Sequence, residues 1–362
     1  MKIAIVLPDL RGGGVERIRL SLAGEFRRLG HGVEFVLMQA QGELLSEAMA
    51  SFAVHDLACR RIRQLPWALA RYLRRYQPDA LLVAMWPLTV VAPLASRLSG
   101  HPCDVLISEH NTLSAQYAAQ GSLHLRLLRF SMALGYRLAR SRVAVSEGVS
   151  RDLAALSGLE RDRFTVIHNP VPCRPPPSRE AMARATACWG IAGGQRIVSV
   201  GSFKPQKNHA MLLRAFARLE RRNARLMLVG AGAEEDELRR LAVELDIGHK
   251  VIFAGFHADP TPFYLTADLF VLASDFEGFG NVIIEALACG TPVVSTNCPS
   301  GPAEILKHGE YGRLVPVGDD TAMADALADA LASEHDTQRL KARATEFSPA
   351  IAASKHLDLL AK

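Results

Sequence analysis

Apolar and β-branched residues gather in short runs along the whole chain, and segments of helical periodicity separate these runs. Six runs in the first half and six in the second predict twelve strands. The first six are KIAIVLP (2–8), VEFVLM (33–38), DALLVAM (79–85), DVLISEH (104–110), RVAVS (142–146) and FTVIHN (164–169). The other six are RIVSVGS (196–202), ARLMLVG (224–230), VIFAGF (251–256), LFVLAS (269–274), PVVSTN (292–297) and GRLVPV (312–317). Alternation of strands and helices predicts an α/β fold with parallel sheets.

A proline-rich segment, NPVPCRPPPSRE, divides the two sets of strands. Its prolines exclude a continuous helix or a central strand, so we predict a stiff linker over residues 169–180. The predicted domains are a Rossmann-like domain over 1–168 and a second one over 181–345, facing each other across a cleft. Residues 346–362 are predicted to form a separate C-terminal helix that can cross back, with Pro349 in its first turn.

The composition agrees with a soluble globular protein of two domains. Of 362 residues, 49% are hydrophobic and 22% charged, and the mean hydropathy is +0.09, which excludes disordered and fibrous classes. No apolar window reaches the length of a spanning helix, and the first residues show no cleavage site, so a cytoplasmic location is expected. The six cysteines show no CxxC spacing, so they are predicted to be small core residues and not zinc or disulfide sites.

The positive charge lies in the first half of the chain. Residues 1–170 hold 21 Lys and Arg against 14 Asp and Glu, whereas the whole chain holds 42 against 37. Arginines alternate with apolar residues at helical spacing in 60–76 and 125–142. Such segments fit an anionic membrane surface, and they equally fit core-facing helices with solvated arginines. Nucleic-acid binding is disfavoured because no recognition motif accompanies the charge.

Two loops between a strand and a helix are suited to phosphate. The first holds Gly12, Gly13 and Gly14, where the backbone can approach a ligand and the helix start attracts an anion. A tight turn explains these glycines equally well, and without GxGxxG spacing a nicotinamide cofactor is disfavoured. The second loop holds Lys204 and Lys207, which either stabilise a departing diphosphate or are simply solvated.

A third loop, SDFEGFGNVIIEALACGTP (274–292), carries two carboxylates. Glu277 precedes the predicted helix and Glu285 lies within it, so the two do not form an ordinary helix face. We expect Glu277 to accept hydrogen bonds from sugar hydroxyls and Glu285 from a ribose, with a diphosphate at the helix start. The alternative for Glu285 is a surface helix residue, which its apolar neighbours disfavour.

The last of these segments resembles the E-x7-E signature of retaining glycosyltransferases of family 4, which have the GT-B fold. Further segments occur in the order typical of that family, namely GGGVERI, SEHNT (108–112), AVSEGVSRDL, VIHNPV, GSFKPQKNH, LVGAGAEEDEL and VIFAGF. The resemblance covers nearly the whole chain.

The resemblance implies roles for individual residues. His110 lies near the transferred sugar, Glu277 contacts that sugar, and Lys207 binds the diphosphate; these three are the catalytic candidates. The family often has Arg where this chain has Ser202, so either Lys204 supplies the missing charge or the diphosphate is held less tightly. The expected donor-binding residues are Gly13, Gly14, Ser202, Lys204, Lys207, Phe256, Glu277, Gly278, Phe279, Gly280, Asn281, Val282 and Glu285. Arg11 and Asn111 are assigned to the acceptor.

These features predict a retaining transferase that moves a hexose or N-acetylhexosamine from a nucleotide sugar to a glycan acceptor. By resemblance the donor is a UDP-sugar, with no other cofactor. The absence of a D-x-D motif predicts metal independence. The basic first domain suits a polyprenyl-diphosphate-linked acceptor in surface-glycan assembly, at the inner face of the cytoplasmic membrane. The alternatives are a nucleotide-sugar epimerase of the same fold and a non-catalytic sugar-nucleotide-binding partner.

Overall fold

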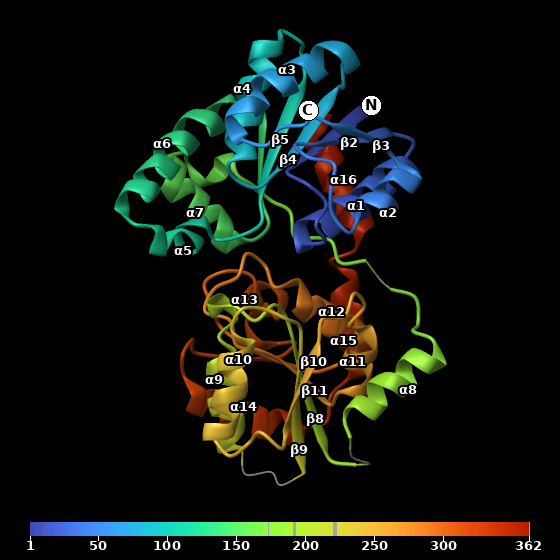
Figure 1. Ribbon diagram of the computed structural model, residues 1–362, viewed down its shortest axis with the longest axis vertical. Helices are drawn as coiled ribbons and strands as arrows, with labels where there is room; N and C mark the ends of the chain where they lie inside the picture. Colours follow the sequence, from blue (N-terminus) through green and yellow to red (C-terminus); the bar gives the residue numbers. More distant parts are fainter. Residues whose placement is uncertain (173, 191–192, 220–222, 362) are drawn as a thin grey trace. The chain divides into compact units, whose positions relative to one another are not determined.

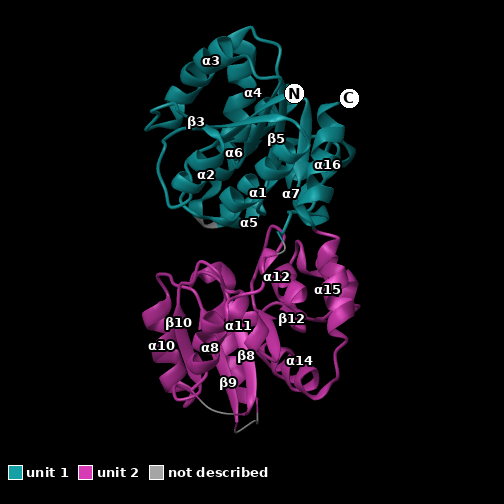
Figure 2. Ribbon diagram, turned by 90° about the vertical axis from the view of Figure 1, so that its right-hand side faces the viewer, with its two compact units in different colours: residues 1–172, 348–362 teal, residues 173–347 magenta. Residues whose placement is uncertain are grey.

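The computed structural model describes residues 1–172, 174–190, 193–219 and 223–361, and its strands form two parallel sheets. The chain divides into two units (Figure 2). Unit 1 comprises Met1–Pro172 and Ser348–Lys362, and unit 2 comprises Cys173–Phe347. The boundary between the units thus falls inside the segment predicted as a linker.

Unit 1 contains a seven-stranded parallel sheet of order β3-β2-β1-β4-β5-β6-β7. The strands are β1 (Lys2–Leu7), β2 (Gly32–Leu37), β3 (Ala53–Asp56), β4 (Ala80–Ala84), β5 (Asp104–Glu109), β6 (Ser141–Ala144) and β7 (Thr165–Val166). The central strands are buried on both faces, which requires their continuous apolar runs. Six of the seven strands were predicted; β3 was missed because it is a four-residue strand at the sheet edge with a half-polar sequence.

The helices of unit 1 cover both faces of this sheet (Figure 1). They are α1 (Gly14–Arg28), α2 (Leu45–Ser51), α3 (Leu65–Tyr76), α4 (Leu88–Ser99), α5 (Leu113–Gln116), α6 (Ser122–Leu138), α7 (Glu147–Ser157) and α16 (Pro349–Leu360). The chain direction across the sheet reverses at β1, so right-handed crossovers put α1 on one face and α3, α4 and α6 on the other. On that second face α4 packs between α3 and α6.

The C-terminal helix α16 belongs to unit 1. It packs against α1, and Ala352, Ala353 and Leu360 join the apolar core of the first sheet. The His356 ring meets the edge of Phe26 with centroids 6.4 Å apart. Pro349 opens the helix, where its missing N–H costs no intrahelical bond. The last segment of the chain therefore returns to the domain in which the chain began.

Unit 2 contains a six-stranded parallel sheet of order β10-β9-β8-β11-β12-β13. The strands are β8 (Gln195–Val200), β9 (Ala224–Val229), β10 (Val251–Gly255), β11 (Leu269–Leu272), β12 (Val293–Thr296) and β13 (Arg313–Val315), all within predicted runs to within one residue. The helices are α8 (Arg179–Cys188), α9 (His209–Arg218), α10 (Glu235–Glu244), α11 (Thr261–Thr266), α12 (Asn281–Cys289), α13 (Pro302–Ile305), α14 (Asp320–Ala332) and α15 (Thr337–Thr345). Two parallel sheets of this kind, each covered by helices, agree with the two Rossmann-like domains that were predicted.

The cysteines agree only in part with their predicted place in the cores. Cys59 and Cys298 are buried, but Cys188 is exposed because it lies on the solvent face of the last turn of α8. Cys173 lies outside the described residues. Among the described helices, none combines the length and apolarity needed to cross a membrane.

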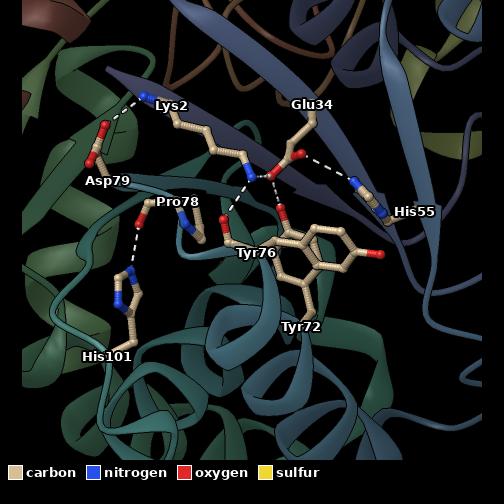
Figure 3. Close-up of polar contacts among 8 residues, drawn as sticks. All are labelled: Lys2, Glu34, His55, Tyr72, Tyr76, Pro78, Asp79 and His101. Atoms are coloured by element: carbon tan, nitrogen blue, oxygen red, sulfur yellow. Dashed lines mark hydrogen bonds and ion pairs between the residues drawn. The ribbon is translucent and has the colours of Figure 1, made fainter.

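A buried carboxylate ties three strands and a helix of unit 1 together (Figure 3). Glu34 of β2 is 6% exposed and accepts a hydrogen bond from Tyr72 of α3. Lys2 Nζ lies 3.2 Å from Glu34 Oε1, and His55 Nε2 of β3 lies 3.1 Å from Oε2. The Lys2 ammonium also donates to the Tyr76 carbonyl at 2.7 Å. The network therefore joins β1, β2 and β3 to α3 through polar contacts.

Replacing Glu34 with Ala is expected to lower the free energy of unfolding by about 3 kcal/mol, because the buried Tyr72 hydroxyl loses its acceptor and the Lys2 ammonium loses its ion-pair partner. Urea unfolding measures this loss. Glu47→Ala, at an exposed glutamate of α2, is the matched control and should stay within about 0.5 kcal/mol of the wild type. Equal stability of the Glu34 variant and the control would contradict a structural role for the network.

Candidate functional site

The candidate donor groups of unit 2 lie beyond the carboxyl ends of two neighbouring strands, β8 and β11. Lys207, in the loop after β8, places its ammonium 2.5 Å from Glu277 Oε1, in the turn after β11. Ser274 donates its hydroxyl to the same carboxylate oxygen at 2.7 Å. The side chains of Lys207 and Glu277 are only 15% and 8% exposed, so this ion pair is screened little by solvent.

Local hydrogen bonds hold these two loops together. Asn208 adopts a left-handed conformation, φ 45°, and its side-chain oxygen caps α9 by accepting from Met211 N at 3.1 Å. The amide of the same side chain donates to Asp275 Oδ1 at 2.7 Å. Gln206 Nε2 donates to the Phe276 carbonyl at 2.8 Å. Lys207 and Glu277 thus meet because the residues beside them are fixed across the two loops.

The start of α12 is shaped by close backbone packing. Gly280 precedes the helix with φ 97°, a conformation that a side chain would strain. A Cβ on Gly301 would lie 1.8 Å from the Phe279 carbonyl oxygen, so glycine alone fits there. The Phe279 side chain is 2% exposed and packs against Phe347, with ring centroids 5.6 Å apart. The backbone of Phe279, and not its buried ring, is therefore the part suited to ligand contact.

Glu285 lies on the second turn of α12 and is half-buried. Its Oε2 accepts a hydrogen bond of 3.0 Å from the hydroxyl of Tyr264, a buried residue of α11. Burial and the neighbouring Glu285 carboxylate raise the pKa of Tyr264 well above its usual range, so this hydroxyl stays a donor. This hydrogen bond fixes the orientation of the Glu285 carboxylate relative to α11.

The remaining donor candidates of unit 2 also follow strand ends. Ser202 is exposed after β8, and Phe256 is 62% exposed after β10. Desolvation and the neighbouring Lys207 lower the pKa of Lys204, and Glu277 acts in the opposite sense. Lys204 therefore lies within electrostatic reach of both members of the Lys207–Glu277 pair. Gly278, Asn281 and Val282 lie in the turn and first residues of α12.

In unit 1 the glycine loop connects β1 to α1, and Gly12 has φ 87°. Gly13 is extended, with φ −69°, so its conformation does not require glycine. A Cβ on Gly13 would meet only the flexible Glu16 carboxylate, and a Cβ on Gly14 would meet nothing within 4 Å. Packing inside unit 1 therefore explains neither of the last two glycines.

The acceptor candidates of unit 1 have partners within the unit. Arg11 is mostly exposed, and its Nε lies 2.8 Å from Asp9 Oδ2, which raises the pKa of the guanidinium. Asn111 donates to Gln116 Oε1 at 2.9 Å, and its own carbonyl accepts from Thr112 N at 3.0 Å. Arg11 thus presents an anchored cation, while Asn111 mainly shapes its own loop.

Both ring nitrogens of His110 are engaged within unit 1. Nδ1 lies 3.0 Å from Asn169 Oδ1, while Nε2 lies 3.1 Å from Ser108 Oγ and 3.3 Å from Arg19 Nη2. Because the guanidinium only donates, Nε2 accepts and Nδ1 carries the proton. Burial and the Arg19 charge lower the pKa of His110 well below its usual range. The imidazole is therefore a fixed, neutral group.

Arg19 is the unexpected member of this group. It is fully buried, and no described residue accepts a hydrogen bond from its Nε or Nη1. Burial lowers the pKa of its guanidinium to about 10. The burial of Arg19 could have been predicted from the sequence, since this residue shares the apolar face of its helix with Leu22, Ala23 and Phe26.

Glu109, next to His110, is a second buried group. It is 2% exposed and accepts hydrogen bonds from Thr89 Oγ1 at 2.6 Å, Tyr136 OH at 2.7 Å and Trp86 N at 3.2 Å. Burial raises the pKa of Glu109 to about 7, even though these donors favour the carboxylate. No sequence pattern predicts this shift, because the donors come from two other segments, residues 86–89 and α6.

Three aromatic rings gather beyond β4, the strand that neighbours β5. Trp86 meets Tyr117 and His124 edge-on, with centroids 5.2 and 5.7 Å apart, and Tyr117 stacks on His124 at 5.1 Å. Trp86 Nε1 also donates to Ser131 of α6 at 3.1 Å. This cluster connects the strand end to the first two turns of α6.

No group of three His, Cys, Asp or Glu side chains within residues 1–172, 174–190, 193–219 and 223–361 is arranged to hold a metal ion. The candidate groups that the structure does bring together are cations, carboxylates and helix starts. Such a set binds anions and hydroxyl groups.

Two family models match the chain, one in each half. Residues 12–174 match the model described as Glycosyltransferase Family 4, and residues 190–347 match Glycosyl transferases group 1.

Curated relatives match over most of the chain. An N-acetylgalactosamine-N,N'-diacetylbacillosaminyl-diphospho-undecaprenol 4-alpha-N-acetylgalactosaminyltransferase of Campylobacter jejuni is 28% identical, with 90% of this chain and 89% of that protein covered. The lipopolysaccharide core biosynthesis glycosyltransferase LpsD of Rhizobium meliloti is also 28% identical, over 96% and 94% of the two chains.

Among solved structures, that of Anabaena HepE in complex with UDP superposes with a TM-score of 0.83, at 23% identity and with 100% of both chains covered. The apo form of the lipopolysaccharide outer core galactosyltransferase WaaB gives a TM-score of 0.78 at 19% identity, with 99% of both chains covered. At these identities the likeness shows a shared fold.

The raised pKa of Glu109 predicts a pH-dependent stability. Since its pKa in the folded protein, about 7, exceeds the unfolded value near 4.5, its protonated form favours folding below pH 4.5, and this contribution is lost as the pH rises toward 7 and above. Between pH 4.5 and 8 the wild type should therefore lose about 3 kcal/mol of unfolding free energy relative to Glu109→Gln, which does not titrate. Urea unfolding of both proteins across this range measures the difference. A difference that stays constant with pH would contradict the shift.

Proposed function

Because this chain belongs to the family 4 glycosyltransferases of the GT-B fold, we propose that it transfers a hexose or N-acetylhexosamine from a UDP-sugar to a glycan acceptor with retention of configuration. The observation that carries this proposal is the contact of Lys207 with Glu277 at the carboxyl edge of the unit 2 sheet. It joins a cation suited to a diphosphate with a carboxylate suited to sugar hydroxyls.

The donor is assigned to unit 2. The diphosphate is proposed to lie against Lys207 and the start of α12, where the helix dipole favours an anion. Glu277 then accepts from hydroxyls of the transferred sugar, and Glu285, which Tyr264 orients, accepts from the ribose. Phe256, an exposed ring after β10, is proposed to meet the base. Solved structures of HepE with UDP and with UDP-glucose support a UDP-sugar.

The role of Ser202 follows from its neighbours. The family often has an arginine at this position, which would place a second cation at the diphosphate. Lys204 lies two residues further on and within electrostatic reach of Lys207 and Glu277. We assign the missing charge to Lys204.

Transfer is proposed to proceed by substitution on one face of the sugar. The bond from the anomeric carbon to the diphosphate oxygen breaks, and the acceptor oxygen bonds to that carbon from the same side. A β-phosphate oxygen takes the proton of the acceptor hydroxyl, so UDP leaves with that proton. Lys207 and the helix start stabilise the charge that develops on the diphosphate. His110 is given the role of a fixed neutral group, because both of its ring nitrogens are used inside unit 1.

The acceptor is proposed to be a polyprenyl-diphosphate-linked glycan of surface polysaccharide assembly, bound through unit 1 at the inner face of the cytoplasmic membrane. The Campylobacter relative is named for transfer to a diphospho-undecaprenol glycan, and the Rhizobium relative for lipopolysaccharide core synthesis. These near-full-length relatives are transferases, which favours transfer over nucleotide-sugar epimerisation or a non-catalytic role. Arg11 of unit 1, a mostly exposed cation anchored by Asp9, is proposed to contact this acceptor.

Lys207→Ala is expected to lower kcat by about 100-fold or more and to weaken UDP binding by less than about tenfold, because the ammonium acts mainly on the charge that develops in the transition state. Glu285→Ala should show the opposite pattern, with weaker donor binding and a smaller change in kcat. Nucleoside diphosphate release and UDP-induced thermal shifts measure the two effects. The matched controls are Lys307→Ala and Glu334→Ala, at exposed positions of unit 2 outside the two loops. A pure binding defect in the Lys207 variant would contradict its assigned role.

Transfer is expected to keep its full rate in excess chelator. In metal-dependent transferases a divalent ion stabilises the diphosphate charge, and here Lys207 and the start of α12 are proposed to do so. Product formation with and without the chelator measures this. Loss of activity on chelation, with recovery on adding Mg²⁺ or Mn²⁺, would refute metal independence.

A further inference from the structure

Helix α6 carries a row of large apolar side chains that unit 1 does not bury. Leu123 is 70% exposed, Leu127 58%, Phe130 72% and Leu134 59%; we call these four residues the α6 stripe. At about 100° per residue they fall within an arc of about 60°. Exposed apolar side chains are normally scattered, so a continuous row of four marks a contact surface.

The opposite side of α6 already provides its contact with the core. Leu128, Met132 and Tyr136 are buried. Gly135 lets the helix approach α4 so closely that a Cβ there would lie 2.7 Å from the Val90 side chain. The stripe is therefore not the core-facing side of the helix. A core-facing helix with solvated arginines describes the buried side of α6 and does not account for the four stripe residues.

The charge around the stripe has one sign. Helices α3, α4 and α6, which pack side by side on one face of the sheet, contain no Asp or Glu. They contain seven arginines, all exposed, namely Arg71, Arg74, Arg75, Arg97, Arg126, Arg129 and Arg137. Arg126 and Arg137 lie within about 70° of the centre of the stripe. Trp67 of α3 and Leu94 of α4 add exposed apolar surface, at 68% and 43%.

A shallow groove continues this basic face at the C-terminal ends of α4 and α6. It has a volume of about 590 Å³ and is lined by Arg97, His101, Arg137 and Arg140, with no acidic side chain in its lining. Arg140 is paired with Asp104 beside the groove at 2.5 Å. The groove offers cations at the edge of the apolar surface, which is where a lipid headgroup phosphate would lie.

We propose that α3, α4 and α6 form the face by which unit 1 docks on an anionic membrane, with the α6 stripe inserted at the boundary of headgroups and acyl chains. A one-sided apolar row bordered by arginines is the pattern of a helix that lies in the membrane interface. Each arginine near the surface adds attraction to anionic lipid, and its stem packs on the apolar layer. A protein partner would be expected to meet some acidic residues on this face. The inference rests on the proposed action at a membrane, but its test measures lipid binding alone.

The test is flotation of the full chain with vesicles of phosphatidylcholine, with and without phosphatidylglycerol. The wild type should float only with the anionic vesicles, and less at higher salt. The double variant Leu127→Glu, Phe130→Glu should bind about tenfold more weakly or not at all. Its control, Met49→Glu with Val243→Glu, makes the same charge change at residues 62% and 72% exposed elsewhere and should float like the wild type.

A second measurement reports on insertion directly. In a Trp67→Phe background, which removes the exposed native tryptophan of this face, the fluorescence added by Phe130→Trp should be quenched by brominated acyl chains, whereas that added by Met49→Trp should not. UDP binding by the stripe variants should equal that of the wild type, which separates this inference from the proposed function. No flotation of the wild type, or equal loss in the control, would overturn it. Self-association abolished by the stripe substitutions, without lipid binding, would show that the face contacts protein instead.

Discussion

The candidate donor site depends on one constraint, that β8 and β11 are neighbours in a parallel sheet. Lys207 and Glu277 are 70 residues apart in the chain, yet their strands run in the same direction side by side, so both loops leave at the same edge. The loops are then joined by the contacts of Gln206 and Asn208, which leave the lysine little freedom. An ion pair with both members mostly buried requires such support, because desolvation offsets much of the attraction between the charges. The electrostatics of the site are therefore a consequence of strand order.

The buried ionisable side chains near the end of β5 in unit 1 differ from the Lys207–Glu277 pair. Around the end of β5 it buries Arg19, His110 and Glu109 without an ion pair among the three. Desolvation shifts the pKa of each toward the less charged form, which indicates a region of low polarity. Such surroundings hold the His110 imidazole in its neutral form and in one orientation. This agrees with a positioning role for His110.

Much of this arrangement could be predicted from the sequence, because it is local. Strand runs, glycine loops and the two glutamates can be recognised from composition and spacing. Twelve strands, the loop positions of Lys207 and Glu277 and the helical position of Glu285 were therefore predicted. Contacts between distant segments were not. Tyr264, which fixes Glu285, and Asn169, which fixes His110, carry no pattern of their own, and their partners are set by the packing of separate elements. Arg19 stands between these cases, since its place on an apolar helix face predicts burial but not its neighbours.

Helix α6 begins beside the polar strand ends of unit 1 and carries the apolar stripe. It therefore adjoins the two surfaces that the sugar head and the lipid tail of a lipid-linked acceptor would need. Leu123 opens the apolar stripe, and the next residue, His124, stacks on Tyr117 and meets Trp86 at the end of β4. Since β4 and β5 are neighbours, this aromatic cluster lies beyond the same sheet edge as His110. The helix that presents an apolar surface thus begins where the sheet presents its polar strand ends. An acceptor with a lipid tail and a sugar head needs this adjacency, because its tail stays in the membrane while its reacting hydroxyl must reach the polar edge. If the stripe lay on α3 alone, the lipid tail and the sugar head of such a molecule would contact separate elements. On α6, the start of the stripe and the aromatic cluster lie within one turn of helix.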